Sequence, residues 1–306
     1  MRVSQTIHFP TRTPDGFNDI LKDVRSLPSV EISGALQMPH NQRGPVPLVI
    51  TSIGSRGLTS GREELYAEAF EKAGLAMLIV DSYSGRGFTE TVSDQGKFSF
   101  AGSVADGLFA LEFMRRDPRF DPARIALFGY SRGGMATVMS YDERIQRAVV
   151  GDGVSFAAHV ALYPPCYLQW RNPQPTAAPM LMLMGGRDVQ APAALGEAYA
   201  QRLNRNGGNV EVITYPEAVH SFDTSTPEAA GNGINLGAAD ILVGDDGLMV
   251  ETHSGVTAEH GWAKFLADVR AARGRPGNLT GYGVLPRDVA VEPILRFLNE
   301  AFGAAG

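Results

Sequence analysis

The stretch RIALFGYSRGG (residues 124–134) decides the fold, because it joins an apolar run of strand length directly to a glycine-flanked serine. Residues 129–133, GYSRG, match the pattern G-x-S-x-G, in which a buried strand turns sharply into a helix and leaves a serine exposed. Small residues on both sides of Ser131 remove side chains that would collide in so tight a turn. The stretch therefore predicts a nucleophile elbow, with a purely structural strand-to-helix turn as the alternative.

Outward from this stretch, apolar runs of strand length alternate with helical patterns. The runs are residues 47–53, 75–82, 124–130, 159–164, 179–186 and 210–216, and the helical patterns are 62–74, 102–116, 132–144, 192–205 and 288–303. Nearly continuous hydrophobicity is typical of strands buried on both faces of a parallel sheet. The alternation predicts an α/β fold with a mostly parallel, doubly wound sheet and right-handed crossovers. Residues 29–39 alternate apolar and polar positions, which predicts an antiparallel strand at the sheet edge.

The chain of 306 residues is predicted to form a single α/β domain over residues 1–306, since such folds often exceed 250 residues. Residues 224–287 form a long excursion between the last predicted strand and the last helix. Within it, residues 241–252 read as a hairpin around a Gly-Asp-Asp-Gly turn and residues 258–273 as a helix. Long excursions are often functional, so we expect a cap-like or assembly element rather than a separate domain.

Composition excludes several classes of protein. The net charge is −6 and no run of Lys and Arg occurs, so nucleic acid is not an expected partner. No apolar stretch has the length of a signal peptide or membrane span, which favours a cytoplasmic protein without a membrane partner. The single cysteine, Cys166, fits a reducing compartment and is expected to be a buried apolar residue. Assembly into a homo-oligomer is left open.

A serine becomes nucleophilic when a base accepts its proton and an acid orients that base. In this fold the order along the chain is serine, acid, histidine, each after a later strand. Asp188 follows the strand at 179–186, and His220 follows the strand at 210–216, so both fit. A helix N-cap is the alternative role for Asp188, and a surface loop the alternative for His220. Asp223 is the rival acid, but it lies very close to His220 in sequence.

The tetrahedral intermediate of acyl transfer needs backbone N–H donors for its oxyanion. The residue after the nucleophile supplies one, which predicts Arg132 N–H. The loop after the strand at 47–53 supplies the other, and Ser55 N–H is predicted because Gly54 allows the turn. The register in this loop is open by one or two residues.

With these residues in place, the chain resembles the dienelactone hydrolase family of α/β-hydrolases over about residues 30–223 and the last helix. The resemblance is carried by DSYSGRGF (81–88), GYSRGG (129–134), FAAHVALYPPC (156–166), GGRDVQAP (185–192) and YPEAVHSFD (215–223), in the family's order. It implies ester or lactone hydrolysis without metal or organic cofactor, with Ser131, Asp188 and His220 in the matching positions. The enzyme that named the family has a cysteine nucleophile and a glutamate in the loop that here reads TSIGSRG, so dienelactone itself is not the expected substrate.

Arginines gather in loops expected at the mouth of the site, among them Arg56, Arg86 and Arg132. A guanidinium pairs bidentately with a carboxylate, so a carboxylate-bearing substrate is predicted, with Arg86 as the favoured anchor. Structural pairing to a local Asp or to loop carbonyls is the alternative for these arginines. Three aromatic residues, Tyr130, Tyr167 and Trp170, are candidates for the wall of an acyl or alcohol pocket, and core packing is their alternative.

The sequence thus predicts a serine hydrolase that cleaves a small carboxylic ester or lactone through an acyl-enzyme on Ser131. The same residues could serve a peptidase, thioesterase, carbon–carbon hydrolase or acyltransferase. A ligand-binding protein that has kept the fold without turnover is the alternative of a different class, because a fold alone does not prove activity. A dinucleotide-binding enzyme is disfavoured, since no G-x-G-x-x-G follows the first buried strand.

Overall fold

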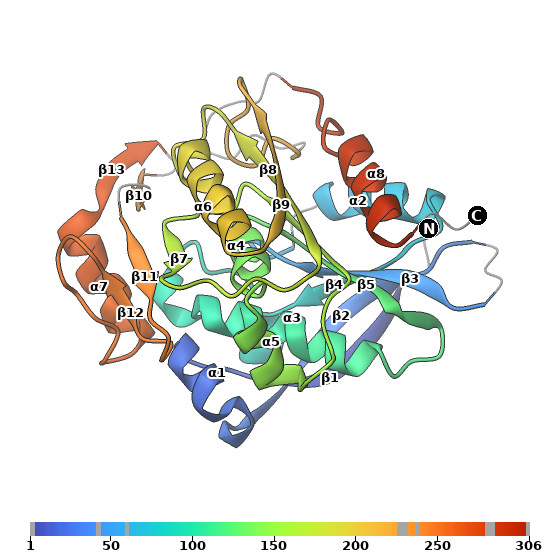
Figure 1. The fold of residues 1–306 in the computed structure, drawn as a ribbon, viewed down its shortest axis with the longest axis horizontal. Helices are drawn as coiled ribbons and strands as arrows, with labels where there is room; N and C mark the ends of the chain where they lie inside the picture. Colours follow the sequence, from blue (N-terminus) through green and yellow to red (C-terminus); the bar gives the residue numbers. More distant parts are fainter. Residues whose placement is uncertain are drawn as a thin grey trace.

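An eight-stranded sheet runs through the middle of the protein, in the order β1-β2-β4-β3-β5-β6-β8-β9 (Figure 1). The structure is a computed structural model that describes residues 4–40, 44–58, 61–224, 232–236, 239–278 and 285–303. From β4 to β9 neighbouring strands are parallel, whereas β1 and β2 are antiparallel additions at one side. The strands are β1 (Gln5–Arg12), β2 (Ser29–Gln37), β3 (Val46–Ser52), β4 (Ala76–Asp81), β5 (Phe120–Tyr130), β6 (Ala158–Leu162), β8 (Pro179–Gly185) and β9 (Asn209–Tyr215).

Helices cover both faces of the sheet, so the central strands are buried on both sides. One face carries α1 (Phe17–Asp23), α3 (Phe100–Met114), α4 (Arg132–Met139), α5 (Glu143–Val150) and α6 (Ala193–Arg205). The other face carries α2 (Arg62–Lys72) and α8 (Val291–Ala301). Alternation along one strand shows the division: Met182 packs with α6, and its neighbours Leu181 and Leu183 pack in the cluster that holds α2 and α8.

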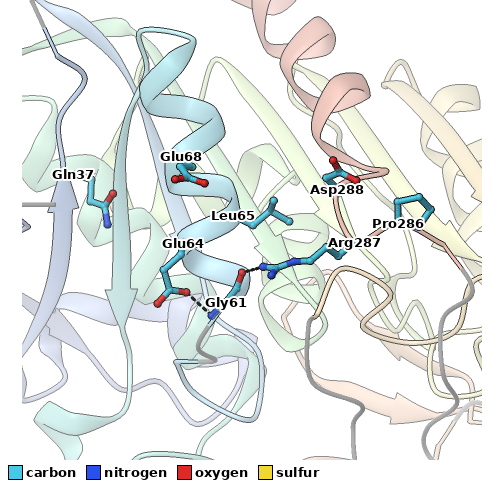
Figure 2. A pocket seen from close by; sticks show the side chains of 8 residues that line it. All are labelled: Gln37, Gly61, Glu64, Leu65, Glu68, Pro286, Arg287 and Asp288. Carbon is cyan, nitrogen blue, oxygen red and sulfur yellow. Dashed lines mark hydrogen bonds between the residues drawn. The ribbon is translucent and has the colours of Figure 1, made fainter. Parts of the chain in front are cut away.

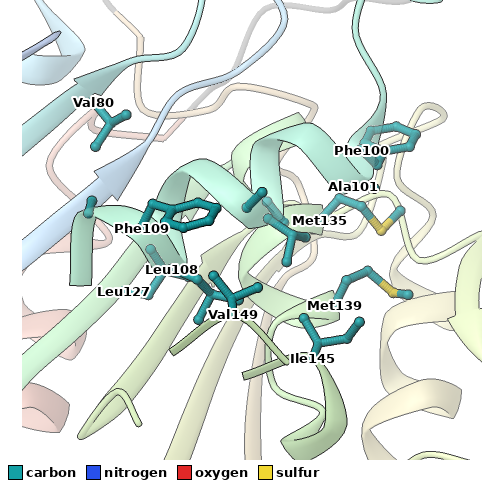
Figure 3. Close-up of a cluster of buried hydrophobic side chains, with 14 of the residues drawn as sticks. Val80, Phe100, Ala101, Leu108, Phe109, Leu127, Met135, Met139, Ile145 and Val149 are labelled. Carbon is teal, nitrogen blue, oxygen red and sulfur yellow. The ribbon is translucent and has the colours of Figure 1, made fainter. Parts of the chain in front are cut away.

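Figure 3 shows the larger core at α3, α4 and α5. Leu108 of α3, Met135 and Met139 of α4, and Ile145 and Val149 of α5 are all at most 1% exposed. At the usual value of about 25 cal/mol per Å² of apolar area, each such side chain contributes roughly 1.5–3 kcal/mol. This core supports the start of α4, and therefore the turn that carries Ser131.

The predicted α/β architecture is confirmed, and the differences are local. The six buried strands lie where the sequence predicts them, although β5 begins at Phe120. The helix predicted over 132–144 is two helices, because α4 ends at Met139 and the Asp142 side chain caps the start of α5. The strand at 29–39 is antiparallel as predicted, but it is not the edge, since β1 pairs along its outer side.

Residues of the 224–287 excursion are joined to the rest of the protein by strand pairing. The predicted hairpin is present as β11 (Ile241–Val243) and β12 (Met249–Glu251), and β11 pairs in parallel with β7 (Leu168–Trp170). A separate pair, β10 (Asn232–Asn235) and β13 (Arg275–Asn278), is antiparallel. The predicted helix is α7 (Trp262–Arg273), which packs against the short η3 (Gln95–Lys97). Within the described ranges no helix is long and apolar enough to cross a bilayer.

The buried Glu251 carboxylate organises the hairpin of this excursion. It accepts hydrogen bonds from the Ser254 backbone and hydroxyl at 2.7 and 2.6 Å and from the Asp240 backbone at 3.3 Å. Burial by itself would raise the pKa of Glu251, but these hydrogen bonds outweigh it and lower that pKa to about 2. The hairpin is therefore held by a charged, fully bonded carboxylate at neutral pH.

Candidate active site

Ser131 occupies a strained turn between the end of β5 and the start of α4. Its φ and ψ are 55° and −117°, a combination that costs a non-glycine residue roughly 1–3 kcal/mol. Neighbouring glycines permit the turn, because a Cβ on Gly133 would overlap the carbonyl oxygen of Ser52, and one on Gly129 would overlap that of Gly133. The Ser131 amide donates to the Leu162 carbonyl of β6 at 3.0 Å. The chain thus bends where the sequence predicts an elbow and presents a half-buried serine.

The crowding at Gly133 gives a stability prediction. We expect Gly133→Ala to lower Tm by about 2–10 °C, because the new methyl group must displace backbone of β3, at roughly 1–3 kcal/mol for an overpacked site. Gly107→Ala in α3 is the matched control, since its Cβ would meet only the tip of Leu127 at 3.3 Å. Differential scanning calorimetry of both variants is the measurement. An unchanged Tm for Gly133→Ala would contradict the crowded turn.

The structure brings Ser131, His220 and Asp188 together from three separate loops. His220 Nε2 lies 2.9 Å from Ser131 Oγ, and its Nδ1 lies 2.7 Å from Asp188 Oδ2. An ionised carboxylate only accepts hydrogen bonds, so Nδ1 carries the proton and Nε2 is left to accept the serine proton. Asp188 and His220 are 5% and 6% exposed, which shields the hydrogen bond between them from water.

Asp188 is held in place by the backbone that follows it. Its Oδ1 accepts from the Gln190 and Ala191 amides at 2.8 and 2.9 Å, while Oδ2 binds the imidazole. The alternative predicted for Asp188, a helix N-cap, is not what the structure shows, because the N-cap of α6 is Pro192. The two loop amides fix which carboxylate oxygen faces His220.

The rival acid Asp223 lies elsewhere, in a buried network behind the histidine. It accepts from the hydroxyls of Tyr66 and Tyr163 at 2.9 and 2.7 Å and from Arg62 Nε at 3.2 Å. Burial raises the pKa of both tyrosines well above the usual value, so their hydroxyls remain donors. The Tyr163 ring packs edge-on against His220, with centroids 4.8 Å apart. Tyr163 thus contacts both Asp223 and the imidazole of His220.

Backbone strain gathers around the same imidazole. Tyr163 has a φ of 37° and Ser221, the residue after His220, has a φ of 58°. Together with Ser131, these are the non-glycine residues of the described segments with positive φ. Positive φ is unusual outside glycine and is held only where the surroundings enforce it.

The loop after β3 lies against the elbow. A Cβ on Gly54 would be 3.5 Å from Ser131 Cβ, and the Gly54 carbonyl accepts from Tyr83 Oη at 3.0 Å. The Ser55 hydroxyl lies 3.3 Å from Arg132 Nε and 3.1 Å from Gln95 Nε2. The backbone of this loop is thus beside the nucleophile, and its role as an oxyanion hole with Arg132 stays a prediction. No sequence pattern indicates a role for Gln95 or Tyr163, because their partners, Arg132 and Asp223, lie far away along the chain.

Arg86 does not fit its predicted role as the carboxylate anchor. All five of its N–H groups bind within the protein: both Asp106 oxygens at 2.8 and 2.9 Å, the carbonyls of Ser82 and Arg12, and the Thr13 hydroxyl. Its side chain is 6% exposed and stacks on Phe98. The structural pairing given as the alternative is what the structure shows.

Two of the three predicted pocket aromatics are also core residues. Trp170 is 1% exposed and donates from Nε1 to the Met139 carbonyl at 3.1 Å. Tyr130 is fully buried, with Arg62 over its ring at 4.4 Å. Neither can reach a substrate. Tyr167 is half-buried and Arg56 is exposed, and their contact with substrate remains a prediction.

Two other titratable residues outside the predicted triad are fully buried. His159 lies in β6 and is fully buried, which lowers its pKa to about 3 and leaves it neutral. Cys166 is buried as predicted, and burial raises the pKa of its thiol to about 12. Neither is a candidate base or nucleophile at neutral pH.

An open pocket of about 850 Å³ lies at the start of α2 (Figure 2). Its lining residues are Gln37, Gly61, Glu64, Leu65, Glu68, Pro286, Arg287 and Asp288. The Arg287 side chain reaches the Gly61 carbonyl across this pocket, and Glu64 binds the Gly61 amide. None of the predicted site residues lines it, so the candidate chemistry stays at Ser131.

Ser131 lies at a strand-to-helix elbow of a mostly parallel sheet, and a histidine that follows β9 lies within hydrogen-bond distance of it. This combination defines an α/β-hydrolase. More narrowly, the chain belongs to the dienelactone hydrolase family, whose sequence profile matches residues 32–242.

Curated relatives match part of the chain. An uncharacterized protein of Mycobacterium tuberculosis is 32% identical over 176 residues, which cover 54% of this chain and 60% of that protein. Acylamino-acid-releasing enzyme 2 of Oryza sativa subsp. japonica is 25% identical over 49% of this chain and 24% of its own length. The chain therefore spans less than two thirds of the length of each of these curated relatives.

Among solved structures, a candidate dienelactone hydrolase from Klebsiella pneumoniae matches with a TM-score of 0.52 and 21% identity, over 72% of this chain and 89% of that chain. Esterase 2 of Thermogutta terrifontis, in its apo form, matches with a TM-score of 0.50 and 18% identity, over 63% and 81% of the two chains. At these identities the likeness shows the fold.

Proposed function

We propose that this protein is a serine hydrolase that cleaves a carboxylic ester or lactone through an acyl-enzyme on Ser131. The observation that carries the proposal is the hydrogen-bond chain from Ser131 Oγ to His220 Nε2 and from His220 Nδ1 to Asp188 Oδ2. Such a chain converts a weakly nucleophilic hydroxyl into one that loses its proton as it attacks.

In the proposed reaction, Ser131 Oγ attacks the substrate carbonyl carbon while His220 Nε2 takes the hydroxyl proton. The negative charge that develops on the carbonyl oxygen is stabilised by the backbone N–H groups of Arg132 and Ser55. His220 then gives its proton to the leaving alkoxide, and the C–O bond breaks to leave the acyl-enzyme. A water molecule, deprotonated by His220, releases the acid and restores Ser131.

A peptidase is the second candidate, and the likeness to a rice acylamino-acid-releasing enzyme favours it. That enzyme shares only part of its length with this chain, so its activity is not transferred here. A substrate carboxylate remains part of the ester proposal, but we no longer propose Arg86 as its anchor, because all five of its N–H groups bind within the protein. Arg56 is the exposed guanidinium of the loop beside the elbow and is its remaining candidate.

The two candidates separate on matched substrates. With an ester, a lactone and an anilide of the same acyl group, we expect kcat/KM for the ester to exceed that for the anilide by at least about 100-fold, because an alkoxide leaves the tetrahedral intermediate more readily than an amine and so depends less on proton donation by His220. Initial rates by absorbance are the measurement. A faster anilide would favour the peptidase, and product shifted from acid to a new ester by added alcohol would indicate an acyltransferase.

A further inference from the structure

Arg132 is a buried cation that the described residues leave without a carboxylate partner. Its side chain is 1% exposed, and its three nitrogens donate to neutral groups: the Phe98 carbonyl at 2.9 Å, the Ser55 hydroxyl at 3.3 Å, and the Gln95 amide oxygen. The guanidinium also stacks on the Phe100 ring at 4.5 Å. Across the residues that the structure describes, no acid forms an ion pair with it.

Two other buried arginines, unlike Arg132, form ion pairs with a carboxylate. Arg62 pairs with Asp223 at 3.2 Å and Arg86 with Asp106 at 2.8 Å. A buried charge without a counter-ion costs several kcal/mol more than a paired one. Burial lowers the pKa of Arg132, yet arginine stays charged in proteins. An unneutralised guanidinium at this position therefore needs a functional reason.

The position of Arg132 beside the predicted oxyanion hole supplies a functional reason for the unpaired charge. The Arg132 backbone and the Ser55 backbone are the two predicted halves of the oxyanion hole, and the Arg132 guanidinium bonds the Ser55 side chain directly. Gln95 bonds both the guanidinium and the Ser55 hydroxyl, so one amide fixes the guanidinium to this loop. The positive charge is thereby held in contact with the loop whose backbone is predicted to bind the oxyanion.

The 224–287 excursion covers this arrangement from outside. Trp262 of α7 donates from Nε1 to the Gln95 carbonyl at 2.8 Å. Its ring packs edge-on against Phe100, with centroids 5.2 Å apart. One residue of the excursion thus contacts two of the groups that surround the Arg132 guanidinium.

We propose that the Arg132 side chain is a positioning residue of the oxyanion hole, kept without a counter-ion so that its charge favours the anionic tetrahedral intermediate, and that Trp262 holds its neutral partners in place. The inference rests on the proposed hydrolase function. Preorganised charge in a site closed to water stabilises a developing oxyanion without reorganisation during the reaction. The excursion is then a component of the catalytic site, not only a cap.

The sharpest test is Gln95→Glu, which keeps the shape of the side chain and gives Arg132 a carboxylate partner. We expect Tm to stay level or rise, because a buried charge becomes paired, while kcat falls by about 10- to 30-fold with little change in KM. Affinity for an alkyl boronic acid should fall by a similar factor, since its serine adduct is a tetrahedral anion. Purely structural support by Gln95 would leave kcat and boronate affinity unchanged.

Two comparisons complete the experiment. Gln95→Met removes the hydrogen bonds but leaves the charge unpaired, so we expect a lower Tm and a smaller loss of kcat than in Gln95→Glu; the reverse order of kcat would overturn the proposal. Arg132→Lys should retain more boronate affinity than Arg132→Met, and equal affinities would overturn it too. Covalent labelling of the wild-type serine by a fluorophosphonate is measured in parallel. If labelling fails, the hydrolase function itself is wrong, whereas intact labelling with an unaffected Gln95→Glu refutes only the role of Arg132.

Discussion

Replacing Ser131 by alanine is expected to lower kcat by about 10⁴- to 10⁶-fold and to abolish covalent labelling by a fluorophosphonate. The reason is that His220 Nε2, 2.9 Å from the hydroxyl, would have no nucleophile to activate. Ester turnover and labelling followed by mass spectrometry are the measurements. The fold should persist, because the substitution removes only one hydroxyl group from a half-buried position.

Ser140→Ala is the matched control for this experiment. Ser140 is a buried serine at the end of α4, and its hydroxyl donates to the Thr137 carbonyl at 2.9 Å. This variant should label and turn over like the wild type. Labelling that persists in Ser131→Ala, or that maps to another side chain, would refute the assignment of the nucleophile.

Asp188→Asn is expected to lower kcat by about 10³- to 10⁴-fold with little change in KM. The Gln190 and Ala191 amides donate to Oδ1, so an asparagine must place its oxygen there and turn its NH2 group toward His220. An NH2 group can only donate, which forces the histidine proton onto Nε2 and removes the acceptor for the serine. Steady-state kinetics on an activated ester measures the effect.

Asp223→Asn tests the rival acid under the same conditions. Asp223 bonds two tyrosine hydroxyls and Arg62, and the Tyr163 ring connects it to the imidazole, so we expect a loss of kcat of about tenfold or less. Tm should fall as well, because Arg62 loses its buried counter-ion. A larger loss in Asp223→Asn than in Asp188→Asn would exchange the roles of the two acids.

The sequence predicted the sheet well because parallel strands buried on both faces leave a strong signal. Runs such as residues 179–185 are apolar without interruption, and their burial depends on the sheet as a whole. The sequence does not predict β1, because this strand is half exposed and contains Pro10. It does not predict β7 either, because three residues are too few to show an alternation of apolar and polar positions. The elbow was recognisable because the crowded turn admits only glycine at Gly129 and Gly133.

Side-chain partners were harder to predict than backbone. Arg86 and Arg132 look alike in the sequence, as arginines in loops that follow strands. Their difference depends on Asp106, twenty residues from Arg86 and buried in α3, and on the absence of any such acid beside Arg132 in the described segments. Which buried acid meets which arginine is decided by tertiary packing, and no local pattern encodes it.

The positive φ angles of Ser131, Tyr163 and Ser221 lower the stability of the folded state but hold the residues around the imidazole in place. Each of these backbones would relax if the folded state loosened there, and the imidazole would then lose the neighbours that aim it. Engineering for heat resistance by easing such torsions would therefore yield a sturdier but slower enzyme. Stabilising substitutions are better placed in helices such as α1 and α5, which contain none of these three residues.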